Sequence, residues 1–267
     1  MNSEKYEELR AVIKGLKTCS VALSGGVDSM TLAAVAHDIL GEQATMVHAV
    51  SAAVPEEASQ RVRTYAKRLG WKLIEINSGE ITAPDYKRNP ANRCYYCKSC
   101  LYTSIAMLQV GTIISGTNLD DLSDYRPGLI AAKEREVRHP FVEAKISKAE
   151  LRQIAEFLGL DDLAQLPASP CLSSRIETGI QINPDDLRLV ERIESKVRSQ
   201  IEAENIRCRV QPEVLSVEID EPVLLGIPED ERDALISTLE PIVAEHQMNR
   251  KILLSPYKKG SAFKVIQ

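Results

Sequence analysis

A six-residue run near the N-terminus, Ser24-Gly-Gly-Val-Asp-Ser29, has the residue types of a phosphate-binding loop. The adjacent glycines Gly25 and Gly26 let the backbone turn tightly and bring its N–H groups against phosphate oxygens, and the predicted helix that follows adds its positive dipole end. The hydroxyls of Ser24 and Ser29 can donate hydrogen bonds, and the Asp28 carboxylate can hold Mg²⁺ or orient a triphosphate. Because the run has no lysine, it differs from the Gly-x-x-x-x-Gly-Lys-Ser/Thr loop. We expect a nucleotide-phosphate site here, with Asp28 and Ser29 as catalytic residues. A plain strand-to-helix turn with an Asp or Ser cap is the alternative.

The chain has six cysteines, which are Cys19, Cys94, Cys97, Cys100, Cys171 and Cys208. Three of them, Cys94, Cys97 and Cys100, fall within seven residues. The first residues, MNSEKYEELR, are charged where a secretory signal has an apolar core, so metal, cluster or thiol chemistry is favoured over a disulfide framework. The Cys94-x-x-Cys97 pair and the distant Cys171 can bind three irons of a [4Fe-4S] cluster, leaving the fourth iron open to a ligand such as sulfide. The alternatives are zinc with Cys100 as the fourth ligand, or three unrelated buried thiols.

Two further groups lie where a nucleotide site is expected. Gly116 and Asn118 follow a predicted strand at its carboxyl end, where ligands bind in open α/β sheets. A plain turn is the alternative. Arg126, in Asp124-Tyr-Arg-Pro-Gly128, can contact a phosphate of ATP or of a substrate, unless it only packs on Tyr125 at the surface.

Three basic residues are candidates for binding a second, phosphate-bearing substrate. Arg207 and Arg209 alternate on a predicted strand, so both side chains face one side of it. Such a pair suits a mononucleotide phosphate through bidentate contacts that lysine does not reproduce. Lys98 can also hold a phosphate. Solvent-exposed charge is the competing interpretation for all three.

Short apolar runs, typical of buried strands, alternate with segments of helical periodicity through the first part of the chain. Strands are expected at 18–23, 44–50, 72–76 and 110–115, and helices at 3–16, 30–40, 55–69, 93–108 and 147–158. This alternation predicts an α/β fold with a parallel sheet and helices on both faces. After Gly179 the order becomes a helix (185–205), two strands (207–211 and 215–219), a helix (229–245) and an apolar run (251–254). We therefore expect a nucleotide-binding domain over 1–178 and a smaller C-terminal α+β domain over 179–267.

The composition restricts the class of protein. The 267 residues include 33 Lys and Arg against 38 Asp and Glu, a net charge of −5, and 44% are hydrophobic. This apolar fraction is too high for a disordered chain, and no apolar run approaches the ~18–20 residues of a membrane span. We expect a soluble cytoplasmic protein without membrane contact. The acidity also argues against a protein that coats nucleic acid.

The motifs together resemble one family. Ser-Gly-Gly-x-Asp-Ser resembles the PP-loop of the ATP pyrophosphatase superfamily, which has an adenine nucleotide alpha hydrolase-like fold. With Tyr95-Tyr96-x-Lys98, Ser123-Asp-Tyr-Arg-Pro-Gly128 and Pro170-Cys-Leu-Ser-Ser-Arg175, the chain is similar to the LarE family of ATP-dependent sulfur transferases. The resemblance implies adenylation of a carboxylate of a pyridinium dicarboxylate mononucleotide and its conversion to a thiocarboxylate, in nickel-pincer nucleotide cofactor biosynthesis. It also implies ATP, Mg²⁺, a sulfide donor and a homo-oligomer.

The resemblance also assigns roles to residues. In one form of the family, the cysteine in the position of Cys171 gives up its own sulfur, and the Cys-x-x-Cys pair is missing. This chain resembles the three-cysteine form, so Cys94, Cys97 and Cys171 are the expected ligands of a [4Fe-4S] cluster that carries an extra sulfide. Cys19, Cys100 and Cys208 are then expected to serve packing. Ser174, Arg175 and Glu194 resemble substrate-binding positions of the family.

Other functions remain alternatives at this stage. Some tRNA thiolases also join a PP-loop to three cluster-binding cysteines, but they need a basic surface, against which a net charge of −5 weighs. A PP-loop amidotransferase or ligase would supply ammonia and would leave the three cysteines without a purpose. An ATP-sensing module that is not an enzyme leaves them unexplained as well.

Overall fold

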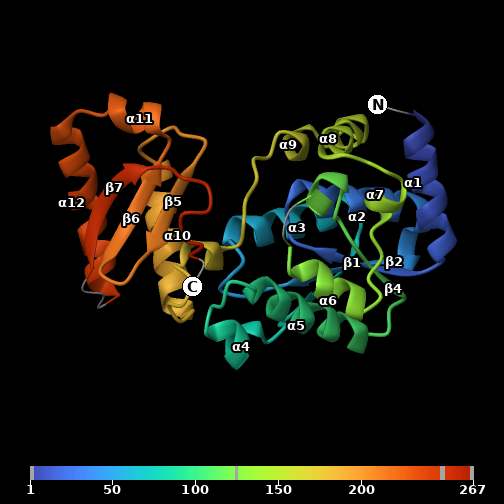
Figure 1. Ribbon diagram of the computed structural model, residues 1–267. Helices are drawn as coiled ribbons and strands as arrows, with labels where there is room; N and C mark the ends of the chain where they lie inside the picture. The colour runs from blue at the N-terminus through green and yellow to red at the C-terminus, as the bar shows by residue number, and fades with distance from the viewer. Residues whose placement is uncertain (1–2, 124–125, 247–249, 265–267) are drawn as a thin grey trace. The chain divides into compact units, whose positions relative to one another are not determined.

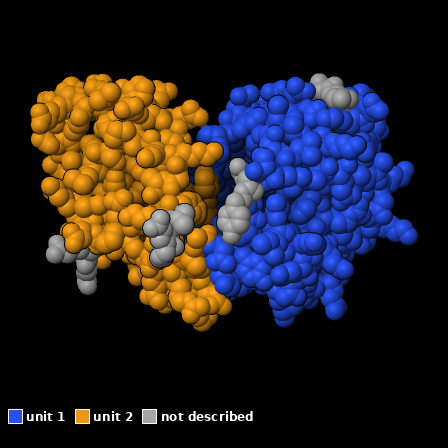
Figure 2. Space-filling view, in the orientation of Figure 1, with its two compact units in different colours: residues 1–80, 92–169 blue, residues 81–91, 170–267 orange. Residues whose placement is uncertain are grey.

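The computed structural model describes residues 3–123, 126–246 and 250–264. The chain divides into two compact units, which Figure 2 shows in different colours. Unit 1 comprises residues 1–80 and 92–169, and unit 2 comprises residues 81–91 and 170–267. Within the described residues, no helix has both the length and the apolar character that a membrane span requires.

Unit 1 is built on a four-stranded parallel sheet in the order β3-β2-β1-β4 (Figure 1). Its elements are α1 (Ser3–Leu16), β1 (Cys19–Leu23), α2 (Val27–Leu40), η1 (Gly41–Gln43), β2 (Ala44–Ala49), α3 (Glu56–Leu69), β3 (Lys72–Ile76), α5 (Arg93–Met107), β4 (Thr112–Ser115), η3 (Leu119–Ser123), α6 (Gly128–Glu134), α7 (Pro140–Glu143), α8 (Lys148–Phe157) and α9 (Asp161–Ala164). The short helix η2 (Glu80–Thr82) lies where the chain first passes from unit 1 to unit 2. The parallel α/β arrangement expected from the sequence is confirmed.

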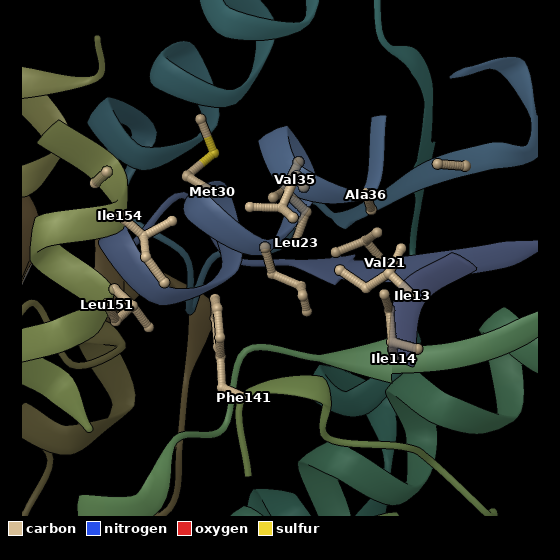
Figure 3. Close-up of a cluster of buried hydrophobic side chains, with 14 of the residues drawn as sticks. Ile13, Val21, Leu23, Met30, Val35, Ala36, Ile114, Phe141, Leu151 and Ile154 are labelled. Atoms are coloured by element: carbon tan, nitrogen blue, oxygen red, sulfur yellow. The ribbon is translucent and has the colours of Figure 1, made fainter. Parts of the chain in front are cut away.

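Helices cover both faces of the sheet in unit 1. On one face, apolar side chains of α1, α2, α7 and α8 form a buried cluster with β1 and β4, part of which Figure 3 shows around Val21, Leu23 and Phe141. On the other face, α5 and α6 pack through Tyr102 and Ala131. Strand β1 is buried along its whole length, which is typical of a central parallel strand with apolar residues on both sides.

The strand order brings the turns after β1 and β4 together. The chain leaves β1 toward β2 and β3 and then returns to the opposite side of β1 as β4. In open α/β sheets, this reversal of direction opens a crevice at the carboxyl ends of the two strands. The loop at 24–29 follows β1 and the turn at 116–118 follows β4, so both candidate nucleotide segments lie at that crevice.

Unit 2 is an α+β arrangement around a three-stranded sheet in the order β5-β6-β7 (Figure 1). Its elements are α4 (Pro84–Lys87), η4 (Leu172–Arg175), α10 (Pro184–Arg198), β5 (Ile206–Val210), β6 (Val214–Ile219), α11 (Glu221–Gly226), α12 (Glu229–Glu245) and β7 (Lys251–Pro256). Strand β6 runs antiparallel to β5 and parallel to β7. The helix expected to reach residue 205 ends at Arg198. Asn205, the residue before β5, instead donates its backbone N–H and its side-chain amide to the carboxylate of Asp220, the residue after β6.

The two compact units divide the chain elsewhere than the boundary expected near residue 178, since unit 2 includes residues 81–91 and its second segment begins at residue 170. Asn89 explains this. Its side-chain nitrogen lies 3.3, 2.9 and 3.0 Å from the carbonyl oxygens of Ile176, Glu177 and Ile180. Ile176 in turn pairs with Val210 of β5. These contacts join two segments that are remote in sequence, and local periodicity does not report them.

Candidate functional site

The loop between β1 and α2 has a backbone that only glycine adopts without strain. Gly25 has a φ of +79°, and a Cβ at this position would lie 2.6 Å from the carbonyl oxygen of Ala58 in α3. Gly26 is the residue before α2 and has an ordinary extended conformation. The first glycine is therefore required by both backbone angle and space, as a loop that turns sharply into a helix N-terminus demands.

The two serines of the loop bond to each other. The Oγ atoms of Ser24 and Ser29 are 3.0 Å apart, and Ser29 Oγ also accepts the Ser24 N–H at 3.0 Å. Ser29 Oγ lies 3.2 Å from the Gly26 carbonyl oxygen, to which it can donate. Ser29 is almost completely buried in the first turn of α2. Its hydroxyl therefore holds the loop from the inside, in addition to the donor role expected from the sequence.

Asp28 is the centre of a charged cluster at the crevice. Both of its carboxylate oxygens lie 2.6 Å from Nζ of Lys148, the first residue of α8. The side-chain amide of Asn118 donates to Asp28 Oδ1 at 3.2 Å. A Cβ on Gly116 would lie 2.7 Å from the Asp28 carbonyl carbon, so this glycine allows α2 to begin close to β4. The structure thus brings together Asp28, Gly116 and Asn118, which the sequence singled out separately.

Lys148 was missed by the sequence reasoning. The signal that locates it is the capping box of Ser147 and Glu150, which is present as expected and makes Lys148 the first helical residue. That motif predicts where α8 begins but not which part of the sheet its first turn faces. The lysine supplies the positive charge that the loop itself lacks.

Arg126 is connected to the same crevice through an aspartate. Its guanidinium pairs with Asp121 at 2.8 Å, and Asp121 accepts the backbone N–H of Asn118 at 3.1 Å. The neighbouring residues 124–125 of the Ser123–Gly128 motif lie outside the described residues. Lys98, on α5, has its Nζ 5.7 Å from the ring centroid of Tyr102.

The cysteines differ in burial. Cys94, Cys97 and Cys100 are half-buried and recur every third residue of α5, which places them along one side of the helix. Burial, followed by the nearby Glu80 carboxylate, raises the pKa of the Cys100 thiol. Cys171, the residue before η4 in unit 2, is exposed. Across residues 3–123, 126–246 and 250–264, no three His, Cys, Asp or Glu side chains are grouped so that they could hold a metal ion.

Cys19 and Cys208 are buried in their strands. Burial raises the pKa of Cys19 to about 12, and it also raises the pKa of Cys208. Thiols that remain protonated in an apolar core do not act as ligands or nucleophiles at neutral pH. Their surroundings agree with a packing role. By contrast, Cys94, Cys97 and Cys171 each retain solvent access.

A buried ion pair forms the centre of the candidate substrate site in unit 2. Arg175 and Glu194 are 2% and 4% exposed and pair through two contacts of 2.9 and 3.1 Å. Nη1 of Arg175 also lies 3.2 Å from the Cys171 carbonyl oxygen and 3.0 Å from Ser174 Oγ. The backbone N–H of Cys208 donates to Glu194 Oε1 at 3.0 Å. This pair therefore holds the segment 171–175 against α10 and β5.

The two predicted strand arginines lie beside this pair. Arg209 pairs with Glu218 of β6 at 2.9 Å and donates to the Ser174 carbonyl oxygen at 3.1 Å. The pKa of Arg207 is lowered, first by burial and then by the positive charge of Arg175. Glu218 was not anticipated, because cross-strand pairing identifies it only once β5 and β6 are in register.

The charged side chains around Arg175 and Glu194 form an arginine cluster with a net positive charge. Its guanidinium groups are those of Arg175, Arg198, Arg207 and Arg209, and its carboxylates are those of Glu194 and Glu218. Four positive groups against two negative ones leave a charge of two, which suits a dianionic phosphate monoester. Five predicted residues, Ser174, Arg175, Glu194, Arg207 and Arg209, thus meet in unit 2.

Comparisons with known proteins give relatives that match most of the chain. No protein-family model matches it. The protein slr1717 of Synechocystis sp. is 39% identical over 223 residues, which cover 82% of each chain. Pyridinium-3,5-bisthiocarboxylic acid mononucleotide synthase of Lactiplantibacillus plantarum is 29% identical over 222 residues, 81% of this chain and 80% of the synthase. A glutamine-hydrolyzing GMP synthase of Aeropyrum pernix is 28% identical over 226 residues, 76% of this chain and 43% of the synthase.

Proposed function

Because the chain belongs to the family of slr1717 of Synechocystis sp. and is also a homologue of a pyridinium-3,5-bisthiocarboxylic acid mononucleotide synthase, we propose that it is an ATP-dependent sulfur insertase. Its substrate is a pyridinium dicarboxylate mononucleotide. A substrate carboxylate oxygen attacks the α-phosphorus of ATP, and pyrophosphate leaves. A sulfide then attacks the carboxyl carbon of the acyl adenylate, AMP leaves, and a thiocarboxylate remains. We place this reaction in nickel-pincer nucleotide biosynthesis, in a cytoplasmic homo-oligomer.

The observation that carries the proposal is the cluster of Asp28, Lys148 and Asn118 at the start of α2. It combines a carboxylate, an ammonium and an amide with a loop that leads directly into the N-terminus of α2. Adenylation needs charge stabilisation where pyrophosphate leaves, and a helix N-terminus beside a lysine supplies it. The similarity to a GMP synthase also supports the use of ATP by this chain.

Asp28 is the residue that would hold Mg²⁺, which when bound neutralises phosphate charge and strengthens pyrophosphate as a leaving group. The carboxylate fits this role because it is one-third exposed and can exchange its bonds to Lys148 and Asn118 for the ion. Lys148 supplies a positive charge to the same place. Ser24, Ser29, Gly116 and Arg126 complete the proposed ATP site.

The arginine cluster of unit 2 is the proposed binding site for the phosphate of the mononucleotide. Arg207 and Arg209 are the proposed phosphate ligands, and Ser174 and Arg175 connect them to the segment that carries Cys171. The net charge of two in the cluster is the physical support for this assignment. Lys98 is proposed as an additional contact for the substrate.

Cys94, Cys97 and Cys171 are the residues that would hold a [4Fe-4S] cluster, which when bound offers its fourth iron to sulfide. Their solvent access supports this set over Cys19 and Cys208, which are buried. In this proposal Cys171 is a ligand and keeps its sulfur through turnover.

The test begins with protein purified without oxygen. We expect about four irons and four acid-labile sulfides per chain, loss of both in Cys97→Ala, and their retention in Cys208→Ala, which changes a buried thiol. Pyrophosphate release should require the dicarboxylated mononucleotide, and mass spectrometry should find Cys171 intact after turnover. Conversion of Cys171 to dehydroalanine would establish the sacrificial form instead. Salt-sensitive retention of tRNA would favour a tRNA thiolase, and transfer of ammonia in place of sulfide would favour an amidotransferase.

A further inference from the structure

We propose that His48, Ser59 and Arg61 are positioning residues that aim the N–H groups of the nucleotide loop, and that α3 therefore decides whether this loop can bind phosphate. The inference rests on the proposed ATP site. None of the three residues lies in the loop, and the sequence motif does not include them. They come from the end of β2 and the first two turns of α3.

The loop directs two carbonyl groups at these residues. The Leu23 carbonyl oxygen lies 2.9 Å from Nδ1 of His48, and the Gly25 carbonyl oxygen accepts from Nη1 of Arg61 at 2.9 Å. His48 is completely buried and Leu23 is nearly so. A buried carbonyl that loses its donor is costly, so these bonds hold the orientation of the two peptide units.

The orientation of the carbonyls determines that of the amides. In a trans peptide unit, the C=O and the N–H point in opposite directions, and no cis peptide occurs among the described residues. The Leu23 carbonyl faces His48, so the Ser24 N–H of the same unit points away from it, to Ser29 Oγ at 3.0 Å. Likewise the Gly25 carbonyl faces Arg61, and the Gly26 N–H points to Ser24 Oγ at 3.4 Å. Both amides thus face the interior of the loop, where phosphate oxygens would be received.

The Leu23 carbonyl selects the tautomer of His48, and Ser59 is placed to bond to the other ring nitrogen. Because the Leu23 carbonyl can only accept, Nδ1 of His48 must carry the hydrogen. In the neutral ring Nε2 is then an acceptor, and the Ser59 hydroxyl, 3.0 Å away, donates to it. Ser59 is buried, so no solvent competes for this bond. One tautomer and one ring orientation satisfy all three groups.

Helix α3 also approaches the loop directly. The Ala58 carbonyl oxygen occupies the space that a Cβ on Gly25 would need, so residues 58, 59 and 61 all act on positions 23–25. The Nη2 atom of Arg61 pairs with the Glu57 carboxylate, one helical turn earlier, at 2.7 Å. Arg61 is therefore held by its own helix while it donates to the loop.

The test compares Arg61→Met with Arg61→Lys and with Arg63→Met. Arg63 is the matched control, because it is an arginine of the same helix that pairs with Glu56 and Glu75 on the exposed side. We measure the Kd of a non-hydrolysable ATP analogue and the KM values of both substrates. Loss of one charge-assisted hydrogen bond should weaken nucleotide binding about tenfold in Arg61→Met. Arg61→Lys should recover most of this loss, while Arg63→Met and the KM of the mononucleotide should stay within about twofold of the wild-type values.

Amide hydrogen exchange without nucleotide separates this inference from the proposed function. Exchange at Ser24 and Gly26 should accelerate in Arg61→Met and in Ser59→Ala, but not in Arg63→Met. Equal exchange in all variants would overturn the inference even if the wild-type protein binds ATP. Failure of the wild-type protein to bind nucleotide, with the exchange pattern as expected, would overturn the ATP site and leave the positioning role intact.

Discussion

Replacing Glu194 by glutamine should destabilise unit 2 severely, because it removes the charge from a buried ion pair and leaves its partner buried. Glu194 Oε1 accepts from Arg175 Nε at 2.9 Å and from the Cys208 N–H at 3.0 Å. Its Oε2 accepts from Arg175 Nη2 at 3.1 Å and from Arg198 Nη1 at 3.4 Å. An amide in its place keeps one acceptor and directs a donor at a guanidinium group. Two of the four bonds are lost and the positive charge of Arg175 is uncompensated.

The expected loss of unfolding free energy is about 3–5 kcal/mol, the usual cost of removing one partner of a buried pair. With a urea m-value of about 2 kcal/mol/M, the midpoint should fall by about 1.5–2.5 M. An exposed pair of the same unit provides the control. Arg192 and Glu245 are 2.7 Å apart but 46% and 62% exposed, so Glu245→Gln should cost less than about 1 kcal/mol.

The single tryptophan of the chain lets the assay distinguish the two units. Trp71 is buried in unit 1, so its fluorescence reports that unit, while far-ultraviolet circular dichroism reports both. In Glu194→Gln, the dichroism transition should begin at lower urea than the fluorescence transition. The double variant Arg175→Met/Glu194→Gln should be more stable than the sum of the single changes predicts, by about 1 kcal/mol or more. Strict additivity, or a loss no larger than that of Glu245→Gln, would refute the reasoning.

Three further predictions follow from other contacts. Gly25→Ala should abolish nucleotide binding, because the added Cβ would meet the Ala58 carbonyl oxygen. The control is Gly79→Ala, which is also at positive φ but has no atom within 4 Å of the added Cβ, so it should leave binding unchanged. Equal binding in both variants would contradict the close approach. Asn89→Ala should lower the stability of unit 2 by about 1–3 kcal/mol in urea unfolding, because it removes the donor to buried carbonyls, and Asn77→Ala on the surface should not. Lys5 and the Ser147 backbone lower the pKa of Glu150, so its contribution to stability is present at neutral pH and is lost as the pH falls below about 4.5. The Trp71 unfolding midpoint should therefore fall less between about pH 5 and about pH 3 in Glu150→Gln, and an unchanged dependence would disprove the linkage.

Local patterns were sufficient for most of the secondary structure. The alternation of apolar runs and helical periodicity predicted β1, β2 and β3 and the helices between them, because each element satisfies its own backbone and shows one face to the core. The capping box placed the start of α8 at the correct residue. Local patterns failed at the end of α10, which stops at Arg198, while Asn205, expected in the helix, donates its backbone N–H to Asp220 instead.

The candidate site divides in the same way. Residue types and spacing singled out Asp28, Asn118 and the two strand arginines as candidates, since few side chains can bind a phosphate or its Mg²⁺. The partners that orient them are remote in sequence. Lys148 is 120 positions from Asp28, and Arg61 is 36 positions from the Gly25 carbonyl that it holds.

The sequence by itself determined the α/β class and predicted the nucleotide loop and the division of cysteines by motif, because these depend on local periodicity and on the chemistry of individual side chains. The tertiary structure decided which charges meet. The parallel order β3-β2-β1-β4 brings the turns after β1 and β4 together. The register of β5 with β6 places Glu218 opposite Arg207, from where it reaches Arg209 diagonally at 2.9 Å. It also assigned residues 81–91 to unit 2 through Asn89. Such contacts depend on chain topology and on burial, because side chains that are remote in sequence come together only when the whole unit has folded.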